Sequence, residues 1–525
     1  VGSEVIYFDW YELDYQCEFI AQNNSITFNY SEPGIHDYLI REFTTDQLRI
    51  FDVTNPSMVE ELIGEVLADD AGYLLSFQDE ISGLTNYRVF TDGQFSTVES
   101  IDEDTPSNLR SITNGADYIV ITHADFIEQA VRLADYRAGR LVGQIPENIL
   151  NSMVVDVQDI YDEFNFGLTG AAPIREFLAY AYNSWEGQQT APSYVVLMGD
   201  GNRDPNNYQN YGRKSYIPPY LAAVDPWIKE TAADNQYVTL TGEDNIPDMM
   251  LGRMAVNTNI EAEIIVDKVI NYELSPPPGD WQQTVLSVAD NADIAGNFPS
   301  ISDSLISCCQ PAPYNAEKVY YGTTHTTIGE AQNAIINEIN IGKIFVNYNG
   351  HGAINSWAGE KLFSTKSMTS LVNGSKLPVV ISMACRDGYY HNQYPYSMDG
   401  EALAEVLVRG DNKGALASWS ATGLGVASGH DHLSRGFYSA LFLTMQLHWV
   451  RLPLPASSGC GQPAVTSTCW IPTCCSATLR RSSPSRSPCP SPAGCWMIQE
   501  TPLRMWQCMI TPVTLHSATP MATTP

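Results

Sequence analysis

The sequence predicts an α/β protein in which a mostly parallel sheet carries helices on both faces and follows a separate β-rich domain. Alternating β-type runs fill residues 1–110, continuous apolar runs alternate with helix-like stretches over residues 111–445, and the composition changes abruptly for residues 446–525. A chain of 525 residues is too long for one ordinary domain, so two or three are expected.

The first region predicts half-buried antiparallel strands, because Tyr, Phe, Ile and Val alternate there with polar residues. Its clearest runs are "EVIYFDWYELDY", "SITFNY", "DYLIREF" and "GYLLSFQD". They contain no group of reactive side chains, so we expect this domain to serve packing or positioning.

The second region predicts strands buried on both faces, which is what continuous apolar runs indicate. The clearest helix between them is 260–273, where apolar residues recur at three- and four-residue spacing, Asn259 is the expected N-cap and "SPPPG" ends the segment. Strand–helix alternation favours a parallel sheet. The apolar runs are 117–123, 193–201, 284–293, 343–352, 376–385 and 414–423.

The tail, residues 446–525, holds 7 of the 11 Cys and 12 of the 31 Pro, but only one acidic residue. A disulfide-stapled domain is one interpretation. A frameshift explains the irregular spacing better, because reading "TCWIPTCCSATLRR" in the shifted frame permits "LLDTYVLLGDPAT", an apolar strand followed by a turn. We therefore expect an aberrant, disordered tail.

The charge balance excludes some partners. The chain has 60 Asp and Glu against 28 Lys and Arg, a formal charge of −32, which repels nucleic acid and anionic lipid. No apolar run approaches the roughly 18 residues needed to span a bilayer. We expect neither nucleic acid nor membrane as a partner.

Three reactive residues follow apolar runs of the predicted sheet. Asp290 follows "VLSVA", His351 follows "KIFVNYNG" and Cys385 follows "LPVVISMA". Active sites of open parallel sheets form beyond the carboxyl ends of the strands. This shared placement predicts that Cys385 is a nucleophile, that His351 is its general base and that Asp290 orients the imidazole. The amides of Gly352 and Cys385 are candidate oxyanion donors.

Each residue also has a structural interpretation. A Cys at a strand end is usually an inert core residue, a His between glycines caps turns, and an Asp after a strand begins helices. The "GDG" around Asp200 lacks the helix that a phosphate site needs. No metal-ligand spacing links His391, His430 and His432, so we interpret them as structural or surface residues.

The motifs resemble the gingipain-type cysteine peptidases, relatives of caspases and legumains. "NYNGHGAINSW" is followed, 34 residues after His351, by Cys385 in "SMACRDG", and "YVVLMGDG", "MLGRMAV" and "IVDKVINYE" occur in the family's order. The resemblance covers about residues 110–440. It implies a caspase-like fold, peptide hydrolysis through a thioester, and the same roles for Cys385, His351 and Asp290.

The resemblance also implies a secreted or cell-surface endopeptidase that cleaves polypeptides after basic residues. Asp303 falls near the family's specificity acid, with Asp431 as a second candidate. No cofactor is required, although structural calcium is common in such enzymes. Family members close the domain with a segment like "LLDTYVLLGDPAT", which is absent from the written frame. Two alternatives stay open: a processing peptidase for sorting signals of exported proteins, and an inactive product of a frameshifted gene.

Overall fold

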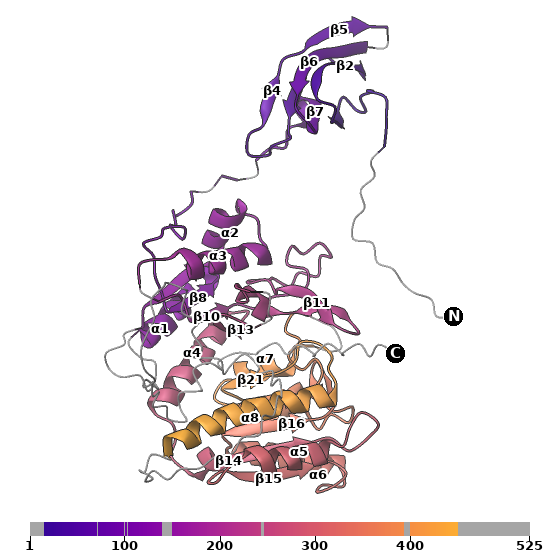
Figure 1. Cartoon of the computed structure of the whole chain (residues 1–525). Coiled ribbons are helices and arrows are strands. Elements are labelled where there is room, and N and C mark those ends of the chain that lie inside the picture. The colour runs from indigo at the N-terminus through magenta and orange to yellow at the C-terminus, as the bar shows by residue number, and fades with distance from the viewer. Residues whose placement is uncertain are drawn as a thin grey trace, which may run out of the picture. The chain divides into compact units, whose positions relative to one another are not determined.

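The computed structural model describes residues 15–449, except positions 71, 99, 102, 139–149, 189, 243–245 and 393–399. The chain divides into two compact units, Val1–Thr105 and Pro106–Pro525 (Figure 1). The run "EVIYFDWYELDY" lies almost wholly outside the described residues, as does the expected tail from residue 450 onward.

The first unit consists of two antiparallel sheets, as its alternating pattern predicts. One has the order β1-β7-β3-β4 and the other β2-β6-β5. Aromatic side chains, among them Phe28, Tyr38, Phe77 and Tyr87, fill its core. The strands are β1 (Ile26–Tyr30), β2 (Gly34–Phe43), β3 (Leu48–Asp52), β4 (Glu60–Leu62), β5 (Glu65–Asp69), β6 (Gly72–Ile81) and β7 (Thr85–Thr91).

The second unit begins with a parallel sheet of order β13-β10-β8-β9. Alternate residues of its strands face opposite cores: Val120 and Val196 pack with α1 and α4, whereas Ile119 and Val195 pack with α2 and α3. The elements are β8 (Tyr118–Thr122), α1 (Ile127–Arg137), β9 (Ser152–Asp156), α2 (Val157–Asn165), α3 (Ala171–Ser184), β10 (Tyr194–Met198), β13 (Met250–Met254) and α4 (Asn259–Leu274).

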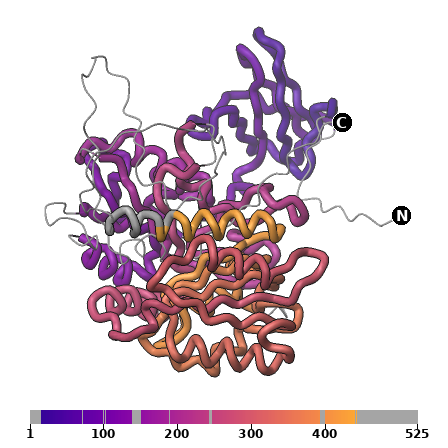
Figure 2. Tube along the Cα trace, turned by 60° about the horizontal axis from the view of Figure 1, so that its bottom comes forward, coloured from indigo at the N-terminus to yellow at the C-terminus, as the bar shows by residue number. Residues whose placement is uncertain are grey.

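A second parallel sheet has the order β15-β14-β16-β20-β21. Helices α5 and α8 cover one face and α6 and α7 the other; α8 runs across the sheet in Figure 2. The elements are β14 (Thr284–Ala289), α5 (Phe298–Cys309), β15 (Asn315–Tyr320), α6 (Ile328–Ile341), β16 (Phe345–Asn349), β20 (Val379–Met383), α7 (Leu403–Arg409), β21 (Ala417–Trp419) and α8 (Ala427–Trp449).

Shorter elements connect these layers. They are β11 (Leu221–Asp225), β12 (Lys229–Ala232), β17 (Gly352–Ala353), β18 (Ser356–Trp357), β19 (Phe363–Ser364) and the 3-10 turns η1 (Asp92–Gln94), η2 (Ala124–Phe126), η3 (Asp234–Tyr237), η4 (Asp280–Gln283) and η5 (Thr365–Ser370). The small sheet β17-β18-β19 directly follows β16, so it lies next to His351 in the turn between β16 and β17.

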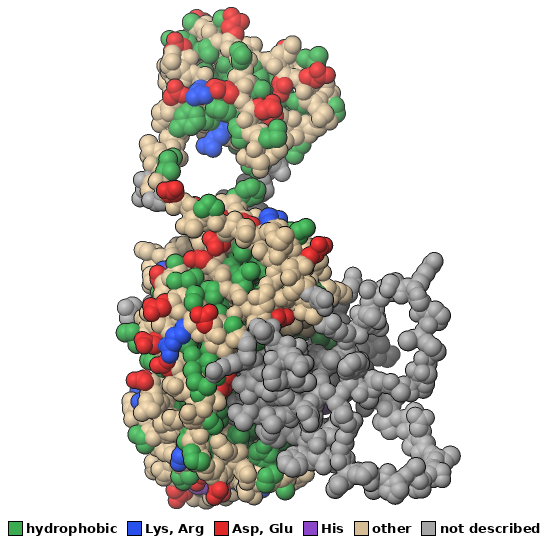
Figure 3. All heavy atoms as spheres, turned by 90° about the vertical axis from the view of Figure 1, so that its left-hand side faces the viewer, with side chains coloured by type: hydrophobic (Ala, Val, Ile, Leu, Met, Phe, Trp, Pro, Cys, Tyr) green, Lys and Arg blue, Asp and Glu red, His purple; other side chains and the backbone are tan. Residues whose placement is uncertain are grey.

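The surface reflects the acidic composition. On the face shown in Figure 3, acidic side chains are spread over both units with sparser basic ones among them. Across the described part of the chain, no helix is long and apolar enough to cross a membrane.

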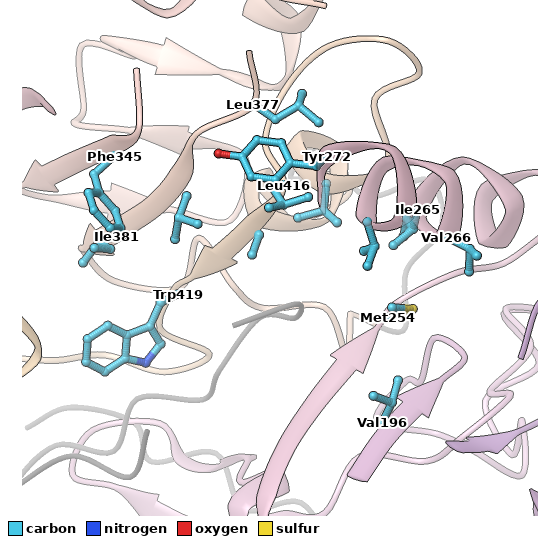
Figure 4. Packing of buried hydrophobic residues seen from close by; sticks show 14 of the residues in the cluster. Val196, Met254, Ile265, Val266, Tyr272, Phe345, Leu377, Ile381, Leu416 and Trp419 are labelled. Carbon is cyan, nitrogen blue, oxygen red and sulfur yellow. The ribbon is translucent and has the colours of Figure 1, made fainter. Parts of the chain in front are cut away.

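One apolar core joins the two parallel sheets. Val196 of the first sheet and Phe345 of the second belong to the same buried cluster, which also contains Ile265 and Tyr272 of α4 (Figure 4). Burying such side chains contributes about 1.5–3 kcal/mol each, so this cluster holds the sheets in one unit.

The predicted α/β class is confirmed, with two differences in detail. The parallel strands divide between two sheets, and α4 belongs to the apolar cluster that contains residues of both. Helix α4 is capped by Thr258, whose side chain accepts a hydrogen bond from the Glu261 amide, and Asn259 is already the first helical residue. The prediction of Asn259 as N-cap was wrong by one position, because Thr258 has the extended backbone that a cap requires.

Candidate active site

The pairing register places the predicted reactive residues at one edge of the second sheet. Asn349 pairs with Ala289 on one side and with Met383 on the other. His351 and Cys385 therefore each stand two residues beyond a paired position, and the Asp290 amide bonds the Asn349 carbonyl at 3.0 Å. Parallel strands end together, so all three residues lie at the carboxyl edge.

The imidazole of His351 contacts Asp293. Its Nε2 atom lies 2.8 Å from Asp293 Oδ2, and the histidine side chain is 49% exposed. The Phe298 ring meets the imidazole edge to face, at 5.4 Å between centroids. The hydrogen bond to His351 lowers the pKa of Asp293, so its carboxylate is ionised at neutral pH. These contacts fix the ring and leave Nδ1 without a hydrogen bond among the described residues.

Asp290 holds the backbone of the same histidine. Its side chain accepts hydrogen bonds from the amides of His351, at 3.2 Å, and Asn291, at 2.8 Å. Burial raises the pKa of Asp290, although both amide bonds oppose this shift. The sequence assigned the imidazole contact to Asp290, and the structure gives it to Asp293. The reason is geometric. Asp290 directly follows β14 and lies beside the backbone of His351, whereas Asp293, three residues further along the same loop, reaches the imidazole ring.

The Cys385 thiol lies against the backbone of Gly425. The Gly425 amide donates to Sγ at 3.4 Å, and Sγ donates to the Gly425 carbonyl at 3.7 Å. Burial raises the pKa of the Cys385 thiol. No hydrogen bond joins the Cys385 thiol and the His351 imidazole within the described residues.

The turn after β16 that carries His351 is called the histidine turn, and the turn after β20 that carries Cys385 is called the cysteine turn. Gly352 brings these two turns close together. A Cβ atom there would lie 2.6 Å from the Cys385 carbonyl oxygen, so only glycine fits. The bond from Ala358 N to His351 O, 2.7 Å, makes Gly352 and Trp357 a non-hydrogen-bonded pair of β17 and β18. The Gly352 amide therefore points away from β18. The Cys385 amide likewise donates no hydrogen bond to any described residue. Both predicted oxyanion donors are available.

A pocket of about 360 Å³ opens beside His351. Three of its lining residues are acidic and none is Lys or Arg, so its electrostatic character favours a cation. The lining residues are Asp290, Asn291, Asp293, His351, Gly352, Ala353, Ala358, Gly359 and Glu360.

The predicted specificity acids lie elsewhere. Asp303, on α5, forms an ion pair with Lys318 at 2.7 Å and accepts a hydrogen bond from the Tyr320 hydroxyl at 3.0 Å. Lys318 lowers the pKa of Asp303. Asp431, on α8, pairs with Arg435 at 2.9 Å. Neither residue lines the pocket beside His351, and each carboxylate is bound to a cation of the protein itself.

The other residues considered from sequence have structural roles. Asp200 is fully buried and pairs with Arg213 at 2.5 Å. His391 is also fully buried, and burial holds its pKa well below its usual value. His432 is exposed and bonds the Ser428 carbonyl. His430 is buried, and its ring packs on Gly425, where a Cβ atom would lie 2.2 Å from Nε2.

No group of three or more His, Cys, Asp or Glu side chains in the described part of the chain is arranged to hold a metal ion. The expectation of structural calcium therefore stays a prediction without assigned ligands.

Comparison with known proteins bears on the family of this chain. The model of peptidase family C25 matches residues 111–451. Lys-gingipain W83 of Porphyromonas gingivalis is 25% identical over 257 residues, covering 49% of this chain and 13% of the relative. Gingipain R2 of the same organism is 28% identical over 250 residues, covering 46% of this chain and 29% of the relative.

The crystal structure of the Arg-specific cysteine proteinase gingipain R aligns with a TM-score of 0.47 and 20% identity, covering 63% of this chain and 67% of that one. The chain spans less than a third of the length of the curated relatives named above. The family match covers most of the chain, so the chain belongs to peptidase family C25, the gingipain-type cysteine peptidases. The resemblance seen in the sequence is confirmed.

Proposed function

We propose that this protein is a cysteine endopeptidase in which Cys385 is the nucleophile and His351 the general base. The observation that carries the proposal is the register of β16 and β20. It sets His351 and Cys385 at equal height beyond two adjacent parallel strands, with Gly352 packed against Cys385. Membership of family C25 supports the same chemistry.

In this mechanism Cys385 Sγ attacks the scissile carbonyl while His351 takes the thiol proton through Nδ1. Asp293 holds Nε2 and stabilises the imidazolium that results. The amides of Gly352 and Cys385 bind the oxyanion of the tetrahedral intermediate. The imidazolium then protonates the leaving amine, which leaves a thioester on Cys385. Water, activated by the same imidazole, hydrolyses that thioester and regenerates the thiol.

The resting thiol sets a requirement on substrate binding. Burial favours the neutral form of Cys385, and its only hydrogen-bond partner among the described residues is Gly425. The thiol must therefore turn from Gly425 toward the imidazole when the substrate binds. The nucleophile is activated at the moment of attack and does not rest as a permanent ion pair with His351.

We extend the proposal to polypeptides cut after Arg or Lys. The acidic pocket beside His351 supports this preference, since Glu360 lines it together with Asp290 and Asp293, the two acids that already hold His351. A substrate cation at Asp303 would have to displace Lys318 and Tyr320. Glu360 is therefore the better candidate for the acid that binds the substrate cation. A secreted or cell-surface location accords with this function and stays part of the proposal.

The test is covalent capture. A peptidyl chloromethyl ketone with Arg at its reactive end should alkylate Cys385, as found by peptide mapping, and should leave the Cys385→Ala variant unlabelled at that turn. The same peptide with Asp at the reactive end is the control. Label found at Cys17, the other free cysteine among the described residues, with none on Cys385, would overturn the proposal.

A further inference from the structure

Asp387 lies two residues after the nucleophile and has no part in the mechanism above. Its side chain is 1% exposed. Arg386, between the two, has a φ of 62°, which turns the chain sharply after Cys385. Hydrogen bonds from Gly388 N to Ala421 O, 2.9 Å, and from Ala404 N to Asp387 O, 3.0 Å, fix this cysteine turn to the neighbouring elements.

The Asp387 carboxyl reaches the hairpin that follows His351. Trp357 Nε1 donates to Asp387 Oδ2 at 3.1 Å, and Trp357 is 1% exposed. Trp357 is also the β18 partner of Gly352, the candidate oxyanion donor. A single hydrogen bond therefore links the turn that carries the nucleophile to the strand that positions this glycine.

The contact continues to the histidine itself. The Trp357 and Tyr348 rings stack at 4.6 Å between centroids and 14° between planes. The Tyr348 hydroxyl donates to the His351 carbonyl at 2.6 Å, and the Ala358 amide donates to the same oxygen at 2.7 Å. The two residues that bind the His351 carbonyl, Tyr348 and Ala358, thus stack on or directly follow Trp357, the residue that Asp387 holds.

We propose that Asp387 is a positioning residue that couples the cysteine turn to the histidine turn through Trp357. The proposal rests on the proposed function, because positioning matters only if Cys385 and His351 react together. An error of about 1 Å in such a pair can lower the rate by about a hundredfold.

The charge of Asp387 bears on the thiol as well. Burial raises the pKa of Asp387 to about 7. Asp387, Asp225 and Arg386 are the charged groups that act on the Cys385 thiol, and Asp387 also acts on Tyr348 of β16. Burial raises the pKa of the Cys385 thiol, and the charge of Asp387 raises it further. As the pH rises through about 7, Asp387 ionises and opposes formation of the thiolate.

Four variants of the full chain separate these roles. Asp387→Asn keeps an acceptor for Trp357 but cannot ionise, whereas Asp387→Ala removes the acceptor. Trp357→Phe removes the donor. Trp281→Phe is the matched control, since Trp281 is also buried and its Nε1 bonds the Pro277 carbonyl, away from the site.

The first measurement is the rate of iodoacetamide alkylation at Cys385 against pH, followed by peptide mapping, which needs no turnover. Asp387→Asn should shift the midpoint to lower pH, and Trp281→Phe should leave it unchanged. Identical profiles for wild type and Asp387→Asn would overturn the effect of the Asp387 charge on the thiol, whereas the coupling through Trp357 is decided by the second measurement.

The second measurement is kcat and KM on a basic peptide substrate at pH 6. Asp387→Ala and Trp357→Phe should lower kcat at least about tenfold relative to wild type, with KM within about twofold of the wild-type value. Asp387→Asn, which keeps the acceptor for Trp357, should retain most of the wild-type kcat. Unchanged kcat in Trp357→Phe would also overturn the proposal, and this variant decides where Asp387→Ala does not fold. A wild type that turns over no peptide sinks the proposed function instead, while the alkylation profile still decides the role of Asp387.

Discussion

The Nε2 atom of His351 lies 2.8 Å from the Oδ2 atom of Asp293. The carboxylate of Asp290 meanwhile bonds the amide of the same histidine. Asp293 thus orients the imidazole ring, and Asp290, in the same short loop, holds the backbone that carries the ring. The proposed role of His351 as general base needs both constraints, because its nitrogen must point at the thiol in one tautomer.

Asp293→Asn should lower kcat by about a hundredfold or more with a smaller change in KM, because the amide cannot stabilise the imidazolium. Asp290→Asn should instead lower the Tm and affect kcat less, since its carboxylate serves two backbone amides. Steady-state kinetics and thermal unfolding of both variants check this. The assignment fails if Asp290→Asn has the larger loss of kcat.

Cys385→Ala should abolish hydrolysis and leave the Tm within a few degrees of wild type. Among the described residues, the thiol forms hydrogen bonds only with the backbone of Gly425, and the substitution removes little packed volume. Iodoacetamide should inactivate the wild type in parallel with modification of Cys385. Turnover retained by the Ala variant would exclude the thioester mechanism.

Glu360→Gln should lower kcat/KM roughly tenfold for peptides cleaved after Arg or Lys and leave neutral peptides unchanged. The reason is that a charge-assisted hydrogen bond to the substrate cation becomes a neutral one. Asp303→Ala is the comparison, because its carboxylate is bound to Lys318. Profiling one peptide library with the three proteins decides which acid selects the substrate. Equal cleavage after neutral and basic residues by wild type would refute the preference itself.

His430 should make the fold sensitive to acid. Burial lowers the pKa of His430 to about 4, whereas an unfolded histidine titrates near 6.5. Between these two pH values the unfolded state binds a proton at His430 and the folded state does not. The free energy of unfolding therefore falls as the pH drops from about 6.5 to 4, by up to about 3 kcal/mol.

The check for His430 is urea unfolding at pH 7 and pH 4.5. His430→Gln should lose less stability between these two pH values than wild type does. His432→Gln, on the exposed side of the same helix α8, should behave as wild type. An equal loss in wild type and His430→Gln would show that the buried ring does not control acid stability.

Restoring the shifted frame after residue 445 should stabilise the peptidase unit. The match to the C25 family model ends at residue 451, beside the change in composition. The restored "YVLLGDP" supplies an apolar strand, and each Leu or Val that it buries adds about 1.5–3 kcal/mol. Four or five such residues rival the roughly 5–15 kcal/mol that holds a domain together. Limited proteolysis of both forms measures the difference. A written tail that resists proteolysis and contains paired disulfides would favour a genuine Cys-rich module.

The strands and the reactive residues at their ends were predictable from the sequence, because a strand buried on both faces must be apolar throughout. The runs before Asp290, His351 and Cys385 became β14, β16 and β20, each ending within a few residues of the reactive side chain. Three further strands of the two parallel sheets, β9, β13 and β15, were not among the runs read from the pattern. Of these, β13 contains Arg253, and β15 contains Glu317 and Lys318.

The sequence by itself determined which residues follow the strands, since local hydrophobic pattern decides where a buried strand stops. Tertiary structure alone decided which acid meets the imidazole, because Asp290 and Asp293 are separated only by the path of their loop. It also decided that Asp303 pairs with Lys318, and that Asp387 meets Trp357 across 30 residues of chain. Such contacts depend on where two turns meet in space, and no local pattern of residue types records that distance.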